Sequence, residues 1–348
     1  MLAQRTLELV DIPSVSGDEA AAMAYLAEAV PLERVWSDAD VLLVTSRRRP
    51  RTPLAVLAGH LDTVPAQDNL PGRLEDGAVV GLGASDMKGG VAVMIELALW
   101  AASAELELDA GFLFFTREEL PAEESPLPPL LEQSEEMRAA ELVVMLEPTD
   151  NLIHAGCLGN LVARLVFSGR SAHAARPWTG ENAIHKAVRE LQAVAELEPV
   201  DVEVGGLCFR EVLSVVAIAG GIAQNVIPDR ATCELNYRYA PDRDPAAAER
   251  RLRELAPADA ELEVLSNNRG APVVLERPLV RRLRDAGGFG VEPKQAWTPV
   301  AQFAEVGLDA VNLGPGATAY AHRRDERVEV RELVRTFEAL QRFFAGSV

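Results

Sequence analysis

A short apolar run that ends in a histidine and an aspartate constrains the fold of this chain most. The run Leu54–Leu57 is apolar throughout and leads directly into Gly59, His60 and Asp62. A run of this kind is typical of a strand buried on both faces of an α/β sheet, where the chemistry lies at the carboxyl ends of the strands. Because residues two apart on an extended chain face the same side, we expect Asp62 to accept the proton of the His60 nitrogen that binds no metal. A loop histidine beside a solvated aspartate is the alternative.

Strand-like and helix-like segments alternate along the first part of the chain. The strands are predicted at residues 42–45, 54–57, 111–116 and 142–146, and a buried helix is predicted at residues 89–102. This order predicts an α/β fold with a mixed, mainly parallel sheet that carries helices on both faces. The segment 121–129 contains four prolines and is predicted to be irregular.

The pattern changes after Asn160. Strands are predicted at residues 161–167, 212–219, 230–239 and 261–265, and helices at 182–197 and 246–255. This order is typical of a small antiparallel α+β unit. Alternating α/β segments return from about residue 272. We therefore predict one catalytic domain, made of residues 1–160 and 272–348, interrupted by an inserted domain of residues 161–271.

Histidines and acidic residues occur where the predicted strands end. The candidates are His60, Asp86, the pair Glu118-Glu119, Glu147 and His322. Four of these five segments follow a predicted strand and Asp86 opens a helix, so all should meet at one edge of the sheet. Two histidines and three carboxylates are a suitable ligand set for two divalent cations that share one carboxylate. The remaining glutamate of the adjacent pair is then free to move protons. Taken singly, an acidic pair is usually solvated and an aspartate at a helix start is usually an N-cap.

Composition narrows the possible partners. The net charge of −19 argues against a nucleic-acid partner, which needs a basic surface. No apolar run reaches the length of a membrane span, and the N-terminal segment does not have the pattern of a signal peptide. The three cysteines form no CxxC pair, which favours the reducing cytoplasm. An anionic substrate would need a locally positive pocket, and bound metal ions are one way to supply it.

Motifs spread along almost the whole chain resemble a known family. They are Gly59–Pro65, Ser85–Gly90, Glu118-Glu119, Leu146–Thr149, Ser171–Arg176, Glu181–Lys186, Asn225–Asp229, Asn236–Pro241, Asn312–Gly316 and Ala321-His322. On these motifs the chain resembles the di-zinc amidohydrolases and exopeptidases, a metallopeptidase family that includes aminoacylase, glutamate carboxypeptidase and peptidase T.

The resemblance implies a role for each candidate ligand. His60 and Glu147 would bind one Zn²⁺, Glu119 and His322 would bind a second, and Asp86 would bridge the two; Co²⁺ or Mn²⁺ are possible substitutes. Glu118 would act as the general base and then as the general acid, and Asp62 would orient His60.

The resemblance also implies a homodimer formed through the inserted domain. His173 of one subunit would reach the oxyanion in the site of the other subunit. Asn225 and Arg238 would contact substrate carboxylates. Further substrate-binding candidates are Arg176, Gly314 and Gly316.

The substrate class follows from the more specific motifs. The segments around His173, Asn182 and Arg238 resemble the desuccinylase members of the family, which implies hydrolysis of N-succinyl-LL-2,6-diaminopimelate to succinate and LL-2,6-diaminopimelate. However, Pro299, Gln302 and Ala317 depart from the pattern of those members. Another N-acyl-amino-acid deacylase, such as acetylornithine deacetylase, or a metallo-dipeptidase or carboxypeptidase is the alternative. A non-catalytic binding protein would have lost a ligand or Glu118, and none is missing.

Overall fold

The chain forms two compact units in a computed structural model that describes residues 1–346. The large unit consists of Met1–Gly156, Val274–Glu292 and Pro299–Val348, and the inserted unit consists of Cys157–Val273 and Pro293–Thr298. The inserted unit thus includes residues 293–298 in addition to a segment close to the insertion expected from the sequence. The catalytic and dimerisation roles of the two units remain predictions.

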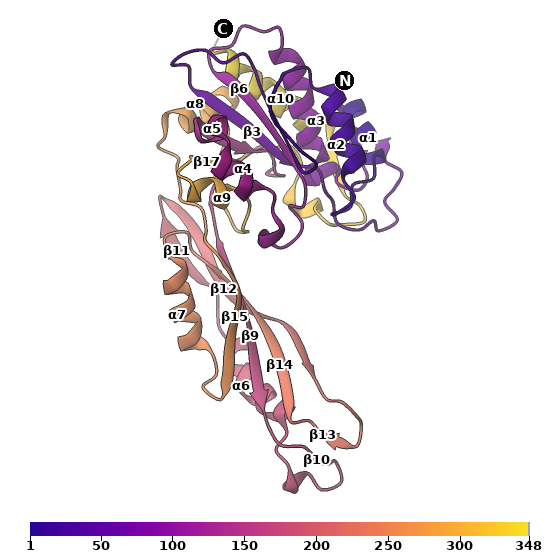
Figure 1. The fold of residues 1–348 in the computed structure, drawn as a ribbon, viewed down its shortest axis with the longest axis vertical. Helices are drawn as coiled ribbons and strands as arrows, with labels where there is room; N and C mark the ends of the chain where they lie inside the picture. Colours follow the sequence, from indigo (N-terminus) through magenta and orange to yellow (C-terminus); the bar gives the residue numbers. More distant parts are fainter. Residues whose placement is uncertain (347–348) are drawn as a thin grey trace. The chain divides into compact units, whose positions relative to one another are not determined.

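The large unit is built on an eight-stranded sheet (Figure 1), in the order β1-β2-β6-β3-β7-β17-β8-β16. The strands are β1 Glu33–Ser37, β2 Val41–Thr45, β3 Leu54–His60, β6 Asp109–Phe115, β7 Ala140–Met145, β8 Ile153–Cys157, β16 Val291–Lys294 and β17 Ala310–Asn312. The four central strands, β6, β3, β7 and β17, are parallel to one another, whereas β1, β2 and β8 pair antiparallel with their neighbours. The predicted mixed α/β sheet is therefore confirmed.

Helices cover the sheet because its central strands are apolar on both faces. Every residue of β2, β3 and β6 is buried, as expected for strands between two helical layers. On one side lie α1 Leu2–Asp11, α3 Gly89–Ala101 and α10 Val330–Ala345, and on the other α4 Leu127–Gln133, α5 Glu135–Arg138 and α9 Val300–Glu305 (Figure 1). The large unit also contains α2 Ala20–Ala29, α8 Pro278–Gly287 and a small sheet of β4 Arg73–Glu75, β5 Ala78–Val80 and β18 Arg327–Glu329. Two short irregular turns, Ala84–Lys88 and Thr318–Tyr320, lie before α3 and after β17. No helix within residues 1–346 is both long and apolar enough to cross a membrane.

The proline-rich segment is partly helical, so the prediction that it is irregular was wrong. A short 3-10 turn covers Ala122–Glu124, and α4 begins at Leu127. Pro128 and Pro129 occupy the first turn of that helix. Backbone N–H groups have no partner inside a helix at these positions, so proline costs no hydrogen bond there.

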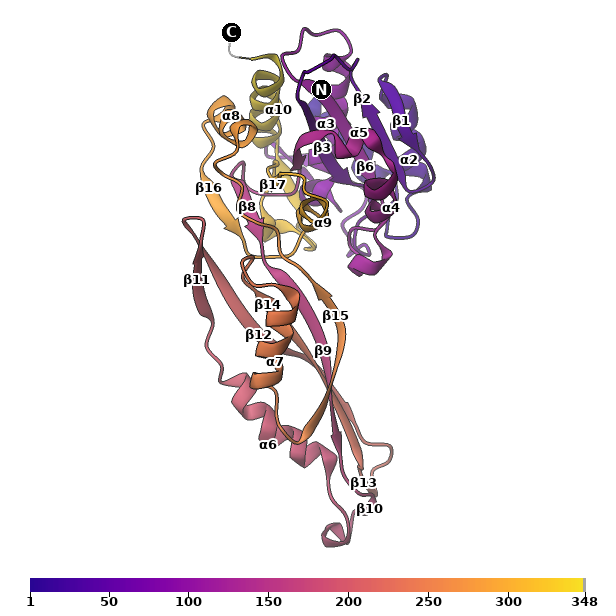
Figure 2. The ribbon, with the colours of Figure 1, turned by 60° about the vertical axis from the view of Figure 1, so that its left-hand side comes forward.

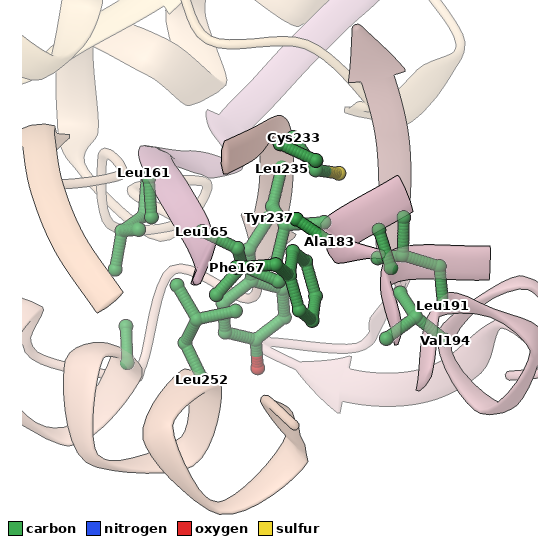
Figure 3. Close-up of a cluster of buried hydrophobic side chains, with 14 of the residues drawn as sticks. Leu161, Leu165, Phe167, Ala183, Leu191, Val194, Cys233, Leu235, Tyr237 and Leu252 are labelled. Carbon is green, nitrogen blue, oxygen red and sulfur yellow. The ribbon is translucent and has the colours of Figure 1, made fainter. Parts of the chain in front are cut away.

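The inserted unit has a five-stranded antiparallel sheet, and Figure 3 shows the cluster of buried side chains, among them Leu165, Phe167, Leu191 and Leu252, that joins this sheet to its helices. In sheet order the strands are β11 Val200–Val204, β12 Leu207–Gly220, β14 Arg230–Tyr239, β9 Gly159–Ser168 and β15 Ala260–Asn268. Buried and half-buried side chains alternate along β9 and β14, as in a sheet that is covered on one side only. The buried side chains pack against α6 Ala183–Ala195 and α7 Pro245–Leu255. The Asn182 side chain accepts hydrogen bonds from the first turn of α6, which fixes where that helix begins.

The two ends of the inserted unit carry different elements (Figure 2). At one end a two-stranded ladder joins β10 Ala172–His173 to β13 Val226–Ile227, just before β14 begins. At the other end β11 pairs with the first residues of β12, near the place where β14 finishes. Residues on these two ends are thus separated by the whole length of the sheet.

Candidate metal centre

The predicted ligands of the large unit converge at the carboxyl ends of its parallel strands. His60 is the last residue of β3, Glu119 follows β6, and Glu147 follows β7. Asp86 lies in the irregular turn before α3, and His322 lies in the loop after β17. Parallel strands end at one edge of a sheet, so the topology brings together residues that are far apart in the sequence.

Asp86 lies between the two histidines. Its Oδ1 atom is 3.2 Å from Nε2 of His60, and its Oδ2 atom is 3.5 Å from Nε2 of His322. Each carboxylate oxygen therefore faces a different imidazole. Nε2 of His60 is also 3.8 Å from Oε1 of Glu147, and Nε2 of His322 is 2.9 Å from Oε1 of Glu119.

These distances suit two metal ions that share Asp86. Potential ligand atoms of His60, Asp86 and Glu147 lie within 4.8 Å of one another, and so do those of Asp86, Glu119 and His322. Donor atoms of a four-coordinate zinc with bonds of about 2.0–2.2 Å lie roughly 3.3–3.6 Å apart. The nitrogen and oxygen donors are also the types that zinc accepts. The residues could therefore hold metal ions, and the number of ions and the ligands of each remain predictions.

Asp62 connects the histidine to the loop that carries Glu118 and Glu119. Nδ1 of His60 lies 3.0 Å from the backbone oxygen of Asp62 and 3.5 Å from its Oδ1 atom. The carboxylate also accepts hydrogen bonds from the backbone N–H groups of Glu118 and Glu119, at 2.9 and 3.0 Å. Burial opposes ionisation, but these hydrogen bonds and His60 lower the pKa of Asp62 to about 2. Asp62 therefore holds both the imidazole and the glutamate pair in place.

Glu118 lies beside the ligand cluster without belonging to either ligand group that shares Asp86. One of its oxygens is within reach of His60 and Glu119, so the three could also hold an ion. Burial, followed by the nearby charge of Glu147, raises the pKa of Glu118 well above its usual value. Bound cations would oppose that effect and favour the carboxylate.

The two histidines are strongly affected by the surrounding carboxylates. Burial alone would lower the pKa of His60, but Asp62 and Asp86 raise it well above its usual value. Hydrogen bonds with Asp86 and Glu119 raise the pKa of the half-exposed His322 to about 10. Such concentrated negative charge attracts either protons or metal ions, and metal binding would displace the protons.

Gly314 and Gly316, predicted as substrate-binding residues, pack against the backbone of the ligand loops. A Cβ atom on Gly314 would lie 2.5 Å from the backbone oxygen of Glu147, and one on Gly316 would lie 2.5 Å from Oγ of Ser85. Gly316 also has a φ of +83°, which favours glycine. The N–H of Gly314 donates to Thr149, and that of Gly316 donates to Glu332. Both glycines thus allow the close approach that places Glu147 and the Asp86 loop, and their substrate contacts remain a prediction.

The remaining predicted site residues lie at opposite ends of the inserted unit. His173 pairs with Val226 in the β10–β13 ladder, and the N–H of Ala174 donates to the backbone oxygen of Asn225. The N–H of Arg176 donates to the backbone oxygen of His173, so His173, Arg176 and Asn225 form one exposed group. Arg238 lies near the end of β14, where its Nε donates to the Asn236 side chain.

The positions that depart from the family pattern, Pro299, Gln302 and Ala317, all lie in the large unit. Pro299 precedes the first turn of α9, and the Gln302 side chain on that helix accepts a hydrogen bond from Ser125. The backbone oxygen of Ala317 accepts a hydrogen bond from the side chain of Ser85.

Two side chains that position the candidate ligands could not be predicted from the sequence. Oγ of Ser16 donates to Asp62 at 2.8 Å, and the buried carboxylate of Glu326 accepts hydrogen bonds from the Asp86 loop. Ser16 lies in a loop rich in similar residues, and Glu326 lies between charged neighbours. No local signal distinguishes either of them, because their partners lie far away in the sequence.

The chain is similar to known proteins over almost its whole length. Residues 56–345 match the model of peptidase family M20/M25/M40. The chain is 40% identical to a protein of Mycobacterium tuberculosis that is provisionally named a succinyl-diaminopimelate desuccinylase, covering 98% of this chain and 97% of that protein. It is 36% identical to the succinyl-diaminopimelate desuccinylase of Corynebacterium glutamicum, covering 98% and 95% of the two chains. The crystal structure of a Bacillus subtilis protein described as a dinuclear metal-binding peptidase has a similar fold, with a TM-score of 0.71, 16% identity, and coverage of 98% and 96%.

Proposed function

The chain belongs to peptidase family M20/M25/M40, and on this basis we propose that it is a metal-dependent amidohydrolase that cleaves N-succinyl-LL-2,6-diaminopimelate. The products would be succinate and LL-2,6-diaminopimelate. The named substrate of the Mycobacterium and Corynebacterium relatives supports this choice, since the similarity to both extends over almost the whole chain. The three cysteines form no disulfide, as expected for an enzyme that acts in the reducing cytoplasm.

The observation that carries the proposal is the position of Asp86 between two histidines. One oxygen faces His60 and the other faces His322, and each side has one more carboxylate, Glu147 or Glu119. We infer two Zn²⁺ ions, with Asp86 as the shared ligand. When bound, the ions would polarise the amide carbonyl and stabilise negative charge in the transition state.

The chain's own residues would then handle the protons. Glu118 lies next to the ligand groups, where its carboxylate can take a proton from the attacking water. The same carboxyl group then gives a proton to the leaving amine as the C–N bond breaks. Asp62 holds the backbone of Glu118 and Glu119 through two hydrogen bonds, so the position of the base is fixed before substrate binds.

Arg238 is suited to bind a substrate carboxylate. Its guanidinium group is half-buried, and burial lowers its pKa from the usual value. Within residues 1–346 it forms no ion pair with an acidic side chain, and its Nε donates to the neutral amide of Asn236. A half-buried guanidinium without a carboxylate partner favours an anionic ligand, for which its planar group is well shaped.

The spacing of residues within the inserted unit supports a homodimer. Arg230 begins β14 next to the β10–β13 ladder, and Arg238 lies roughly 27 Å further along an extended strand. His173 lies in the β10–β13 ladder, and the backbone oxygen of Asn225 accepts a hydrogen bond from Ala174 beside it. Figure 2 shows β10 and β13 at the end of the inserted unit where β14 begins. One small substrate cannot contact both ends of the same inserted unit. If both ends serve catalysis, one site must combine Arg238 of one subunit with His173 and Asn225 of its partner.

The edge of β12 offers a surface for such a partner. Among the described strands, β12 pairs with β11 only up to Glu211, so residues 212–220 have a strand neighbour on one side only. Val216 and Ile218 on this stretch are 58% and 54% exposed, and Val188 on the adjacent α6 is 60% exposed. An exposed strand edge has unpaired backbone N–H and C=O groups that can pair with another strand. In a two-fold symmetric dimer, β12 of one subunit would pair antiparallel with β12 of the other.

Subunit mixing tests whether His173 acts on the partner's site. Glu118→Gln and His173→Ala homodimers should each be nearly inactive. After exchange, random pairing should restore up to about a quarter of wild-type activity, since half of the dimers are mixed and each mixed dimer has one complete site. The measurement is hydrolysis of the succinylated substrate before and after verified exchange.

A second mixture provides the control. Glu118→Gln mixed with His60→Ala should regain nothing if His173 is the group shared between subunits, because in each mixed dimer both sites carry one of the two substitutions. No recovery in the first mixture, despite exchange, would mean that His173 serves its own chain or has no catalytic role.

Substrate comparison tests the proposed function itself. A succinyl group adds a second carboxylate, and a site that pairs with it leaves buried polar groups unmatched when the carboxylate is missing. We expect kcat/KM for N-succinyl-LL-2,6-diaminopimelate to exceed that for N-acetyl-ornithine or simple dipeptides by at least about 10²-fold. Arg238→Met should reduce this ratio, whereas Arg253→Met, in the last turn of α7, should not. Equal kcat/KM values for acetylated and succinylated substrates would instead favour a general deacylase, in keeping with the altered Pro299, Gln302 and Ala317.

A further inference from the structure

Glu326 is a buried acid whose two oxygens are directed at the backbone of the Asp86 loop. Its side chain is almost fully buried. Oε2 accepts a hydrogen bond from the N–H of Gly83 at 2.9 Å, and Oε1 accepts from the N–H groups of Ser85 and Asp86 at 3.1 and 2.9 Å. Three backbone donors of one short loop thus converge on one carboxylate.

The Asp86 loop needs an external partner because its backbone is irregular. Gly83 has a left-handed conformation, and Asp86 and Met87 have non-helical dihedral angles. Successive N–H groups that point into one concavity form a natural anion site. In this protein the anion is supplied by Glu326, and the Lys88 ammonium group adds a favourable charge interaction with it. The loop conformation that presents the Asp86 carboxylate therefore depends on a residue 240 positions later in the chain.

Glu326 also belongs to the segment that carries His322. The two residues are four positions apart. The backbone oxygen of Glu326 accepts a hydrogen bond from Gly81, and the next residue, Arg327, pairs with Val80 in the small sheet. The segment that supplies one metal ligand is thereby fixed to the loop that supplies the shared ligand.

We propose that Glu326 is a positioning residue that sets the Asp86 carboxylate between His60 and His322. This inference rests on the proposed two-metal function, because it assigns Glu326 a role in presenting the shared ligand. Glu326 lies outside the ligand groups found among the described residues, so it acts through the backbone of Asp86. Since Asp86 serves both ions, a loosened loop should weaken both sites together.

Zinc affinity of the Glu326→Gln variant tests the inference without any assay of catalysis. In this variant the side-chain amide must point an N–H donor at one or more of the three backbone N–H groups. The hydrogen bonds to those groups are lost, while the size and shape of the side chain are kept. We expect the Kd of both zinc ions, measured by competition with a chromophoric chelator, to rise by about 10- to 100-fold, as for other groups that orient metal ligands.

Glu96→Gln is the matched control. Glu96 is also a buried carboxylate of the large unit, but its partner is Arg5 rather than a ligand loop. Both variants should lose stability in the metal-free state, and only Glu326→Gln should lose zinc affinity. If Glu326→Gln does not fold, Glu326→Asp should show the same loss of affinity, because its shorter side chain cannot reach all three donors.

Three results would overturn the inference. The first is a zinc Kd in the Glu326 variants that changes no more than in Glu96→Gln, and the second is weakening of one ion only. The third is wild-type protein that binds no zinc, which would refute the two-metal function itself and is distinguished from the other two by the wild-type titration.

Discussion

Glu118→Gln should retain both metal ions and lose most of the hydrolytic activity. We expect kcat to fall by about 10²-fold or more, the usual effect of losing a general acid–base group. Glutamine keeps the size of the side chain and its position after β6, where the backbone N–H is held by Asp62. It cannot accept a proton from water or give one to the leaving amine. The loss should therefore appear mainly in kcat, with a smaller effect on KM.

The measurement combines steady-state kinetics with metal analysis of the same samples. Glu123→Gln, an exposed residue shortly after the same loop, is the control and should behave as wild type. Because Glu118 can also group with His60 and Glu119, the metal content is decisive. A variant that retains one ion instead of two would identify Glu118 as a ligand, and a variant with unchanged kcat would exclude it as the acid–base group.

The sequence predicted the central strands and indicated the candidate ligands that follow them, because both depend on local patterns. The run Leu54–Leu57 is apolar because β3 is buried between two helical layers. His60 follows it because polar groups can approach a ligand only where the strand ends. Glu119 and Glu147 were proposed for the same reason, since each follows a predicted strand. Because β6, β3 and β7 are parallel, these two residues and His60 lie at the same edge of the sheet.

Other parts of the site could not be predicted because they depend on contacts between distant segments. The hydrogen bonds from Gly83 and Asp86 to Glu326 join residues more than 200 positions apart. Short elements such as β18 contain too few residues for a recognisable period. Likewise, no spacing in the sequence indicates that Arg238 and His173 lie at opposite ends of the inserted unit. That separation follows from the register of β14 and the position of the β10–β13 ladder.

Removal of metal should abolish activity and destabilise the large unit. Without cations, the carboxylates of Asp86, Glu119 and Glu147 and the nearby Glu118 repel one another across a few ångströms. Ions that bind only the folded state stabilise it, by about 2.7 kcal/mol for each site at a free concentration of 100 times Kd. A chelator should therefore lower Tm, and added Zn²⁺ should restore both Tm and activity.

Substitution of the two histidines should separate the two ions. His60→Ala should weaken the site that includes Glu147, and His322→Ala should weaken the site that includes Glu119. Each variant should retain one tightly bound ion. His185→Ala, on α6 of the inserted unit, is the control and should leave both ions in place. Wild-type zinc content and activity in His322→Ala would show that this histidine is not a ligand.

The most direct test of a two-metal desuccinylase is hydrolysis of N-succinyl-LL-2,6-diaminopimelate by metal-free protein during stepwise addition of zinc. The geometry around Asp86 predicts no turnover without metal and a maximum when two ions per chain are bound. The same rate with and without zinc, or a maximum at one ion, would contradict the two-metal account.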